Sequence, residues 1–97
     1  VERPNTRSIF WMTSLVLNRT FAATRDGLIA RLKELEIDSR PFFPPSSGFE
    51  MFRDSGASTP VSAHLAENGV NLPSGHSLTE EEVDWVAQNV RTILLNA

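Results

Sequence analysis

The last quarter of the chain carries the most complete set of helix signals, and a helix of this kind constrains the whole fold. Thr79 and Glu82 have the spacing of a capping box, in which each side chain satisfies a backbone amide at the helix start. An isolated amphipathic helix is marginal in water, so a second layer must cover its apolar stripe, and we expect a sheet there. The predicted stripe consists of Val83, Val86, Val90, Ile93 and Leu94.

Two further helices are expected upstream. Thr24 is placed to cap a helix whose apolar residues follow the helical period. Thr59 followed by Pro60 predicts the start of a short helix over residues 60–67, and Asn68 with Gly69 predicts a left-handed stop. The apolar positions of the first of these helices are Leu28, Ile29, Leu32 and Leu35.

Three segments read as strands. Residues 9–17 are apolar on both alternating faces, which predicts a buried central strand. Residues 37–43 predict a second strand that ends at Pro44 and Pro45, and residues 70–72 predict a third. The order indicates an α+β fold, with a small sheet of about three strands covered by three helices. We expect a linker over residues 1–8 and one domain over residues 9–97, and the strand directions stay open.

The composition excludes several classes of function. The net charge of −3 is spread along the chain, which argues against nucleic acid or an anionic membrane as a partner. No apolar run approaches the roughly 20 residues of a membrane helix. The absence of cysteine favours a reducing, cytoplasmic location. The chain begins at Val1 without a methionine, so we expect a fragment of a longer polypeptide.

No residue of the chain is predicted to be catalytic. Lys33, the single lysine, falls on the polar face of a predicted helix, where a solvated amine stays protonated and is a poor Schiff-base former. His64 falls on the short helix and His76 in a polar loop. The acidic residues 80–82 suit the first turn of the last helix for electrostatic reasons alone. A small enzyme that uses either histidine with a carboxylate is therefore the least favoured hypothesis.

One segment has the chemistry of a ligand contact. Arg40 leads into a stiff aromatic loop that contains Phe42, Phe43 and Ser47, and this loop can present a cation and hydroxyls to a ligand. Trp11 is a weaker candidate, since most buried tryptophans belong to the core. The structural alternative for Arg40 is an ion pair with a nearby carboxylate.

The order of several motifs resembles one family. Trp11 and Met12 stand in the first strand, residues 37–43 follow the first helix, and residues 69–74 precede the segment 78–82. Together they resemble the DegT/StrS group of sugar-nucleotide aminotransferases, and most closely its perosamine synthetase-like branch, over nearly the whole chain. The resemblance implies the small C-terminal domain of a fold-type I aminotransferase, a homodimer whose large domain carries the catalytic lysine and holds pyridoxal phosphate. It also implies amino transfer from glutamate to a keto-sugar nucleotide.

The resemblance also suggests which residues face the substrate cleft. These are Arg40, Phe42, Phe43 and Ser47, with Trp11 beside them. Many relatives have a histidine where this chain has Ser47, and a proline where it has Glu50, so the identity of the sugar stays open. The alternative hypothesis is a freestanding module of the same fold that binds a small ligand without catalysis. An exposed apolar surface favours the domain hypothesis, because it is the expected site of packing against the large domain.

Overall fold

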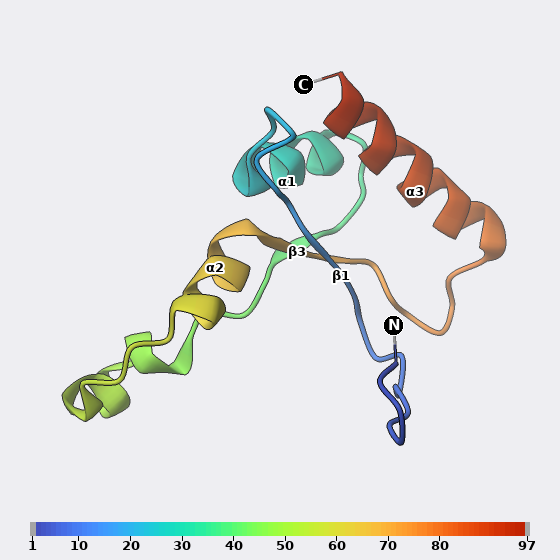
Figure 1. The fold of residues 1–97 in the computed structure, drawn as a ribbon. Coiled ribbons are helices and arrows are strands. Elements are labelled where there is room, and N and C mark those ends of the chain that lie inside the picture. Colours follow the sequence, from blue (N-terminus) through green and yellow to red (C-terminus); the bar gives the residue numbers. More distant parts are fainter. Residues whose placement is uncertain (1, 97) are drawn as a thin grey trace.

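The computed structural model describes the backbone of residues 2–96 (Figure 1), so the predicted boundaries at residues 1 and 97 lie outside the described part. The division between a linker and a domain near residue 8 stays a prediction. In chain order the elements are β1 (Thr13–Val16), α1 (Arg25–Glu34), β2 (Arg40–Pro41), the 3-10 turns η1 (Ser46–Gly48) and η2 (Glu50–Ser55), α2 (Pro60–Asn68), β3 (Gly69–Leu72) and α3 (Glu80–Leu95).

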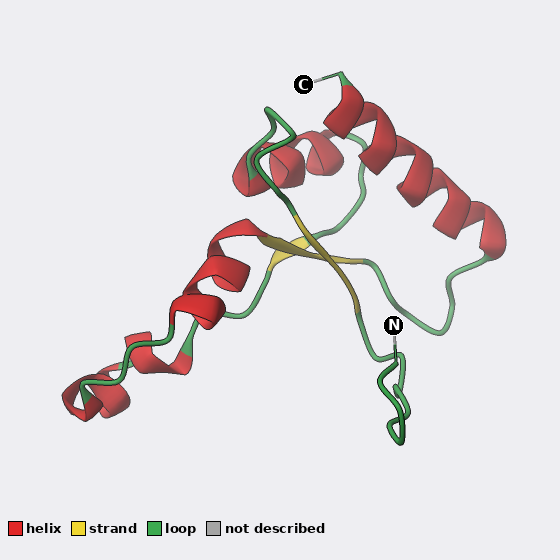
Figure 2. Cartoon of the chain, in the orientation of Figure 1, coloured by secondary structure: helices red, strands yellow, loops and turns green. Residues whose placement is uncertain are grey.

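The three strands form one antiparallel sheet with the order β1-β3-β2. This confirms the predicted α+β fold with three strands and three helices, and it settles the strand directions that the sequence left open. The last strand in sequence lies in the middle of the sheet, because both earlier strands pair with it. Figure 2 shows the short strands crossing at the centre of the molecule.

The prediction of a buried central strand over residues 9–17 is wrong. Only Thr13–Val16 form β1, which is an edge strand, and the side chains of Ile9 and Phe10 are 86% and 80% exposed. An apolar pattern on both faces predicts a strand that other elements cover on both sides. Among the described residues, the core covers only part of residues 9–17. Leu15 and Leu17 reach the core, whereas the residues before β1 do not.

The predicted strand over residues 37–43 is also shorter than expected. Regular pairing is confined to Arg40 and Pro41, followed by one further bond from the amide of Phe42 to the carbonyl of Gly69, at 2.9 Å. Proline has no amide hydrogen to donate, so Pro41 gives the ladder no N–H bond, and Pro44 and Pro45 prevent its continuation after Phe43.

The core lies between the sheet and the pair α1 and α3, which pack together on one side of it (Figure 1). Leu28 and Leu32 of α1 and Val70 of β3 are fully buried. The stripe on α3 is confirmed for four of its five residues, but Val83 is about half exposed because the first turn of α3 extends past the core. The buried core residues are Leu17, Leu28, Leu32, Ile37, Val70, Val90 and Ile93.

The helix caps agree with the sequence at two helices and differ at the third. Thr79 and Glu82 form the predicted capping box, with bonds of 3.1 and 2.9 Å, and Thr24 caps α1. Thr59 precedes Pro60 at the start of α2 as predicted, but its side chain makes no capping bond. The predicted left-handed stop is also wrong, since Gly69 is extended, with φ −90° and ψ 140°.

Gly69 is instead required by close packing. A Cβ atom at this position would lie 2.6 Å from the Cβ of Phe42 and 2.4 Å from a carbonyl oxygen of α2. Only a residue without a side chain permits this approach of the two segments.

Residues 42–68, which we call the arm, extend from one end of the sheet (Figure 1). The radius of gyration is 15.5 Å, larger than the value of about 13 Å for a compact chain of 100 residues. Among the described residues, no helix combines the length and apolar character that crossing a bilayer requires. Large apolar side chains are exposed before β1 and along the arm: Ile9, Phe10, Trp11, Phe43, Phe49, Met51, Phe52 and Val61.

Candidate functional site

Three of the five predicted site residues form one aromatic cluster. The rings of Trp11 and Phe43 are stacked, with centroids 6.0 Å apart and planes inclined by 19°. Phe42 meets Phe43 edge-on, with centroids 5.8 Å apart. Trp11 stands two residues before β1 and Phe43 two residues after β2, so the cluster joins segments from opposite edges of the sheet.

Local contacts hold the aromatic cluster in place. The carbonyl oxygen of Trp11 accepts a hydrogen bond from the hydroxyl of Ser74, at 3.1 Å. The residue before it, Phe10, has φ 51°, a left-handed conformation that is rare for a bulky side chain. Phe42 packs closely against Gly69. Both Trp11 and Phe43 are more than half exposed, which leaves the stacked pair open to a ligand or a partner surface.

Arg40 lies on β2 with its side chain largely in solvent. Its Nε is 3.5 Å from Oδ1 of Asp38, so the ion pair that was the structural alternative is present, and both side chains are more than three-quarters exposed. An exposed pair of this length contributes little free energy. The guanidinium of Arg40 therefore remains available to an anionic ligand.

Ser47 lies in the arm, apart from the aromatic contacts. Its Oγ is 2.7 Å from Oγ1 of Thr59, and this bond links η1 to the start of α2. The hydroxyl of Thr59 that was expected to cap α2 is used here instead. The observed role of Ser47 is thus to brace the arm, and its assignment to a substrate cleft stays a prediction.

Two polar residues beside Arg40 were missed by the sequence analysis. Asn71 is the polar member of β3 and is 6% exposed, and its Oδ1 accepts a 2.6 Å hydrogen bond from the hydroxyl of Ser14. Asn71 also pairs with Arg40 across the β2–β3 ladder. The available signal was an asparagine between two apolar residues of a predicted strand, because a buried amide is costly unless it is bonded.

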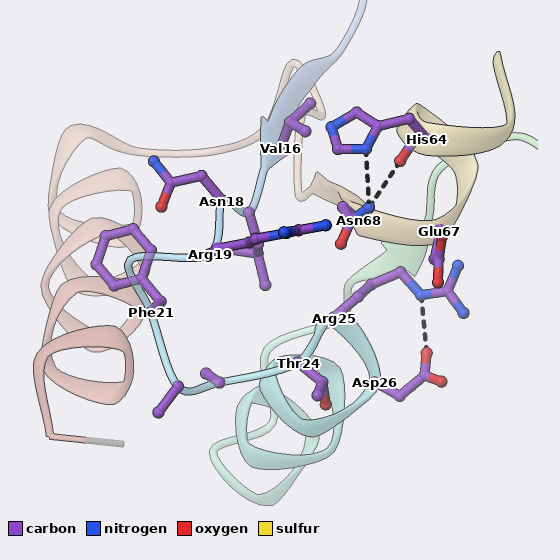
Figure 3. A pocket seen from close by; sticks show the side chains of 13 residues that line it. Val16, Asn18, Arg19, Phe21, Thr24, Arg25, Asp26, His64, Glu67 and Asn68 are labelled. Atoms are coloured by element: carbon purple, nitrogen blue, oxygen red, sulfur yellow. Dashed lines mark hydrogen bonds and ion pairs between the residues drawn. The ribbon is translucent and has the colours of Figure 1, made fainter. Parts of the chain in front are cut away.

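A hollow of about 680 Å³ lies elsewhere, between the loop after β1, the start of α1, and α2 (Figure 3). None of the five predicted site residues lines it. Arg25 contacts Asp26 at 2.8 Å and donates to the carbonyl oxygen of Ala66, so this arginine ties α1 to α2. We place the candidate site at Arg40 and the aromatic cluster, where four of the five predicted residues lie.

Neither histidine has the partners of an acid–base site. His64 faces Asn68 on α2, whose Nδ2 is 3.3 Å from Nδ1 of the imidazole (Figure 3). His76 lies in the exposed loop before α3. Within the described residues, no ion pair joins either histidine to a carboxylate. In the same part of the chain, no three or more histidine, aspartate or glutamate side chains are grouped so that they could hold a metal ion.

Comparison with known sequences gives one family and several relatives. Residues 1–91 match the DegT/DnrJ/EryC1/StrS aminotransferase family. A GDP-perosamine synthase of Vibrio cholerae is 33% identical over 92 residues, which cover 93% of this chain and 25% of that protein. A GDP-perosamine synthase of Escherichia coli O157:H7 is 33% identical over 81 residues, which cover 84% of this chain and 22% of that protein. The chain thus spans about a quarter of the length of these relatives.

Comparison with solved structures supports the same fold. The Streptococcus pneumoniae protein Spr1654, described as a sugar aminotransferase, superimposes with a TM-score of 0.72 in its PMP form and again in its apo form. The match covers 88% of this chain and 22% of that structure, at 21% sequence identity. The three-stranded sheet and its helices therefore occur within a much longer chain in that protein.

Proposed function

The chain belongs to the DegT/DnrJ/EryC1/StrS aminotransferase family, and we propose that it is the C-terminal small domain of a sugar-nucleotide aminotransferase. The parent enzyme transfers an amino group from glutamate to a keto-sugar nucleotide, with pyridoxal phosphate as the cofactor that stabilises the reacting carbanion. The observation that carries this proposal is the match of nearly the whole chain to about a quarter of each relative.

The described residues do not fit pyridoxal phosphate itself. A cofactor of this class requires a lysine whose amine can be neutral, usually because burial or nearby charge disfavours the ammonium form. Lys33 is the single lysine, and it lies exposed on α1. We therefore assign the catalytic lysine and the cofactor to a large domain outside this chain, and no catalytic residue to the chain itself.

The proposal also assigns two partners to the chain, the large domain of the same polypeptide and the second subunit of a homodimer. The extended arm and the exposed apolar residues before β1 support this part of the proposal, because both leave surface uncovered. A cytoplasmic location belongs to the same proposal and is supported by the absence of cysteine.

Within the parent enzyme, Arg40 is proposed to bind an anionic group of the substrate. The rings of Trp11, Phe42 and Phe43 form a wall of the cleft, against which an apolar face of a sugar or base can pack. Ser47 stands at the position of the usual histidine and can offer a hydrogen bond, but not a positive charge.

The first test is the mass of the native protein, measured by probing cell extract with an antibody raised against this chain. We expect a band several times heavier than 10.8 kDa. The purified native protein should then aminate keto-sugar nucleotides when glutamate is supplied. A native band at the mass of this chain would contradict the proposal and leave a freestanding binding module as the alternative.

A second test uses the 97-residue chain alone. After incubation with pyridoxal phosphate and reduction with borohydride, mass spectrometry should find no more adduct than the surface amines of an unrelated protein acquire under the same conditions. Lys33→Arg is the matched control, since it keeps the charge and removes the amine. A stoichiometric adduct at Lys33 that the control lacks would place the cofactor lysine in this chain, against the proposal.

A further inference from the structure

The register of the sheet aligns three polar side chains on one face. Ser14 of β1 pairs with Asn71 of β3, and Arg40 of β2 pairs with the same asparagine from the other side. Side chains alternate between the two faces of a strand, so these three residues point away from the face of Leu15 and Val70, which pack in the core. We call this set the polar row.

Asn71 is the buried member of the polar row, and only one of the two polar atoms of its side-chain amide has a hydrogen-bond partner among the described residues. Its Oδ1 accepts the hydrogen bond from Ser14, whereas its Nδ2 has no hydrogen-bond partner among the described residues. The one described side-chain atom that is both closed to solvent and unbonded is Oγ of Ser39. The Nδ2 of Asn71 is therefore not fully closed to solvent, and none of the described residues accepts a hydrogen bond from it.

The bond from Ser14 also fixes the orientation of this donor. Because the two branches of a carboxamide lie in one plane, holding the oxygen branch toward β1 turns the nitrogen branch away from β1. Directly opposite residues on antiparallel strands have Cα atoms about 4.5–5.5 Å apart. The amide of Asn71 and the guanidinium of Arg40 can thus donate to a single oxyanion, which is the group that paired N–H donors bind best.

We propose that Asn71 donates a hydrogen bond from Nδ2 to the same substrate oxyanion that Arg40 binds. Ser14 is a positioning residue, since it orients the amide without touching the substrate. This inference rests on the proposed function, which assigns Arg40 to the substrate cleft. Two substrates carry a suitable oxyanion, the carboxylate of glutamate and the phosphates of the sugar nucleotide.

The test is Asn71→Asp in the full-length enzyme, with KM and kcat measured for each substrate separately. Aspartate keeps the acceptor for Ser14, but it removes the donor and adds a negative charge. We expect the KM of one substrate to rise about ten-fold or more, with kcat changed much less. Asn18→Asp is the matched control, because the Oδ1 of Asn18 accepts a hydrogen bond from the amide of Thr20 that aspartate keeps, and Asn18 lies in the loop after β1, outside the polar row. It should leave both KM values unchanged.

The outcomes distinguish the carboxylate from the phosphates, and a failure of this inference from a failure of the proposed function. A rise in KM for glutamate alone identifies the carboxylate, and a rise for the sugar nucleotide alone identifies a phosphate. Ser14→Ala should raise the same KM by a smaller factor. Ser14→Thr keeps the hydroxyl and should therefore have the KM of the wild type. An active wild-type enzyme whose KM values do not respond to Asn71→Asp would overturn this inference only. A wild-type enzyme without transaminase activity would overturn the proposed function.

Discussion

Replacing Ser39 by alanine is expected to stabilise the chain. The side chain of Ser39 is 9% exposed, and its hydroxyl oxygen is closed to solvent and has no hydrogen-bond partner in the described part of the structure. It precedes β2 and lines a hollow between α1 and the segment that leads into that strand. In the unfolded chain the same hydroxyl bonds to water, so folding loses that bond without a replacement.

The expected gain follows from two opposing effects. A buried hydroxyl without a partner costs about 1–3 kcal/mol in proteins. Alanine removes this cost but leaves a space the size of one oxygen atom, and the weaker van der Waals attraction around that space offsets part of the gain. We expect a net stabilisation of about 1 kcal/mol, which raises Tm by roughly 4–8 °C in a chain of this size.

The assay is urea unfolding of the 97-residue chain, followed by far-UV circular dichroism. Ser58→Ala is the matched control, because Ser58 is exposed in the loop before α2 and its loss should change the free energy of unfolding by less than about 0.5 kcal/mol. A Ser39→Ala variant that is less stable than the wild type would refute the reasoning, since it would mean that the hydroxyl is bonded in the folded chain.

Three further substitutions test the fold by thermal or urea unfolding. Leu32→Ala should lower the free energy of unfolding by about 2–5 kcal/mol, because this side chain is fully buried, and a decrease of less than about 1 kcal/mol would contradict the observed core. Gly69→Ala should destabilise the chain, since the new Cβ would meet Phe42 at 2.6 Å, and a neutral result would show that the arm can shift. Thr79→Ala should cost about 1 kcal/mol by removing the acceptor for the amide of Glu82, and an unchanged Tm would argue against the capping box.

The helices were predictable because their signals are local. The capping box of α3 and the threonine cap of α1 lie within four residues of the groups that they satisfy, so sequence spacing is enough to identify them. The buried stripe of α3 was right except at Val83. Val83 fits the helical spacing of the stripe, but the core does not extend to it. The local sequence does not show where the elements that would cover it end.

The strands were predicted less well because their extent depends on distant partners. Residues 9–17 have the composition of a buried strand, yet only the residues opposite β3 form a strand, and most of that strand is exposed. Gly69 was read as a turn residue, whereas its lack of a side chain serves the contact with Phe42, 27 positions earlier in the chain. Both errors come from applying local rules to positions that are decided by packing.

The candidate site shows the same division. Arg40 and the aromatic residues after it were identified from the chemistry of one short segment, but the stacking of Trp11 on Phe43 joins residues more than 30 positions apart. The polar row can be recognised only when the registers of both strand pairs, β1–β3 and β2–β3, are known. Asn71 could have been singled out as a polar residue in an apolar strand, but its partners could not.

The polar row and the aromatic cluster together explain why this chain leaves so much surface open. A three-stranded sheet with α1 and α3 on one side has its other face uncovered unless something else packs there. An apolar open face would drive non-specific association, whereas the exposed side chains of Ser14 and Arg40 let this face remain hydrated until a specific ligand or partner replaces the water. Asn71 is buried between them. Aromatic rings beside the two edge strands add exposed contact area. The arrangement is therefore suited to one wall of a cleft, whose other wall the parent enzyme supplies under the proposed function.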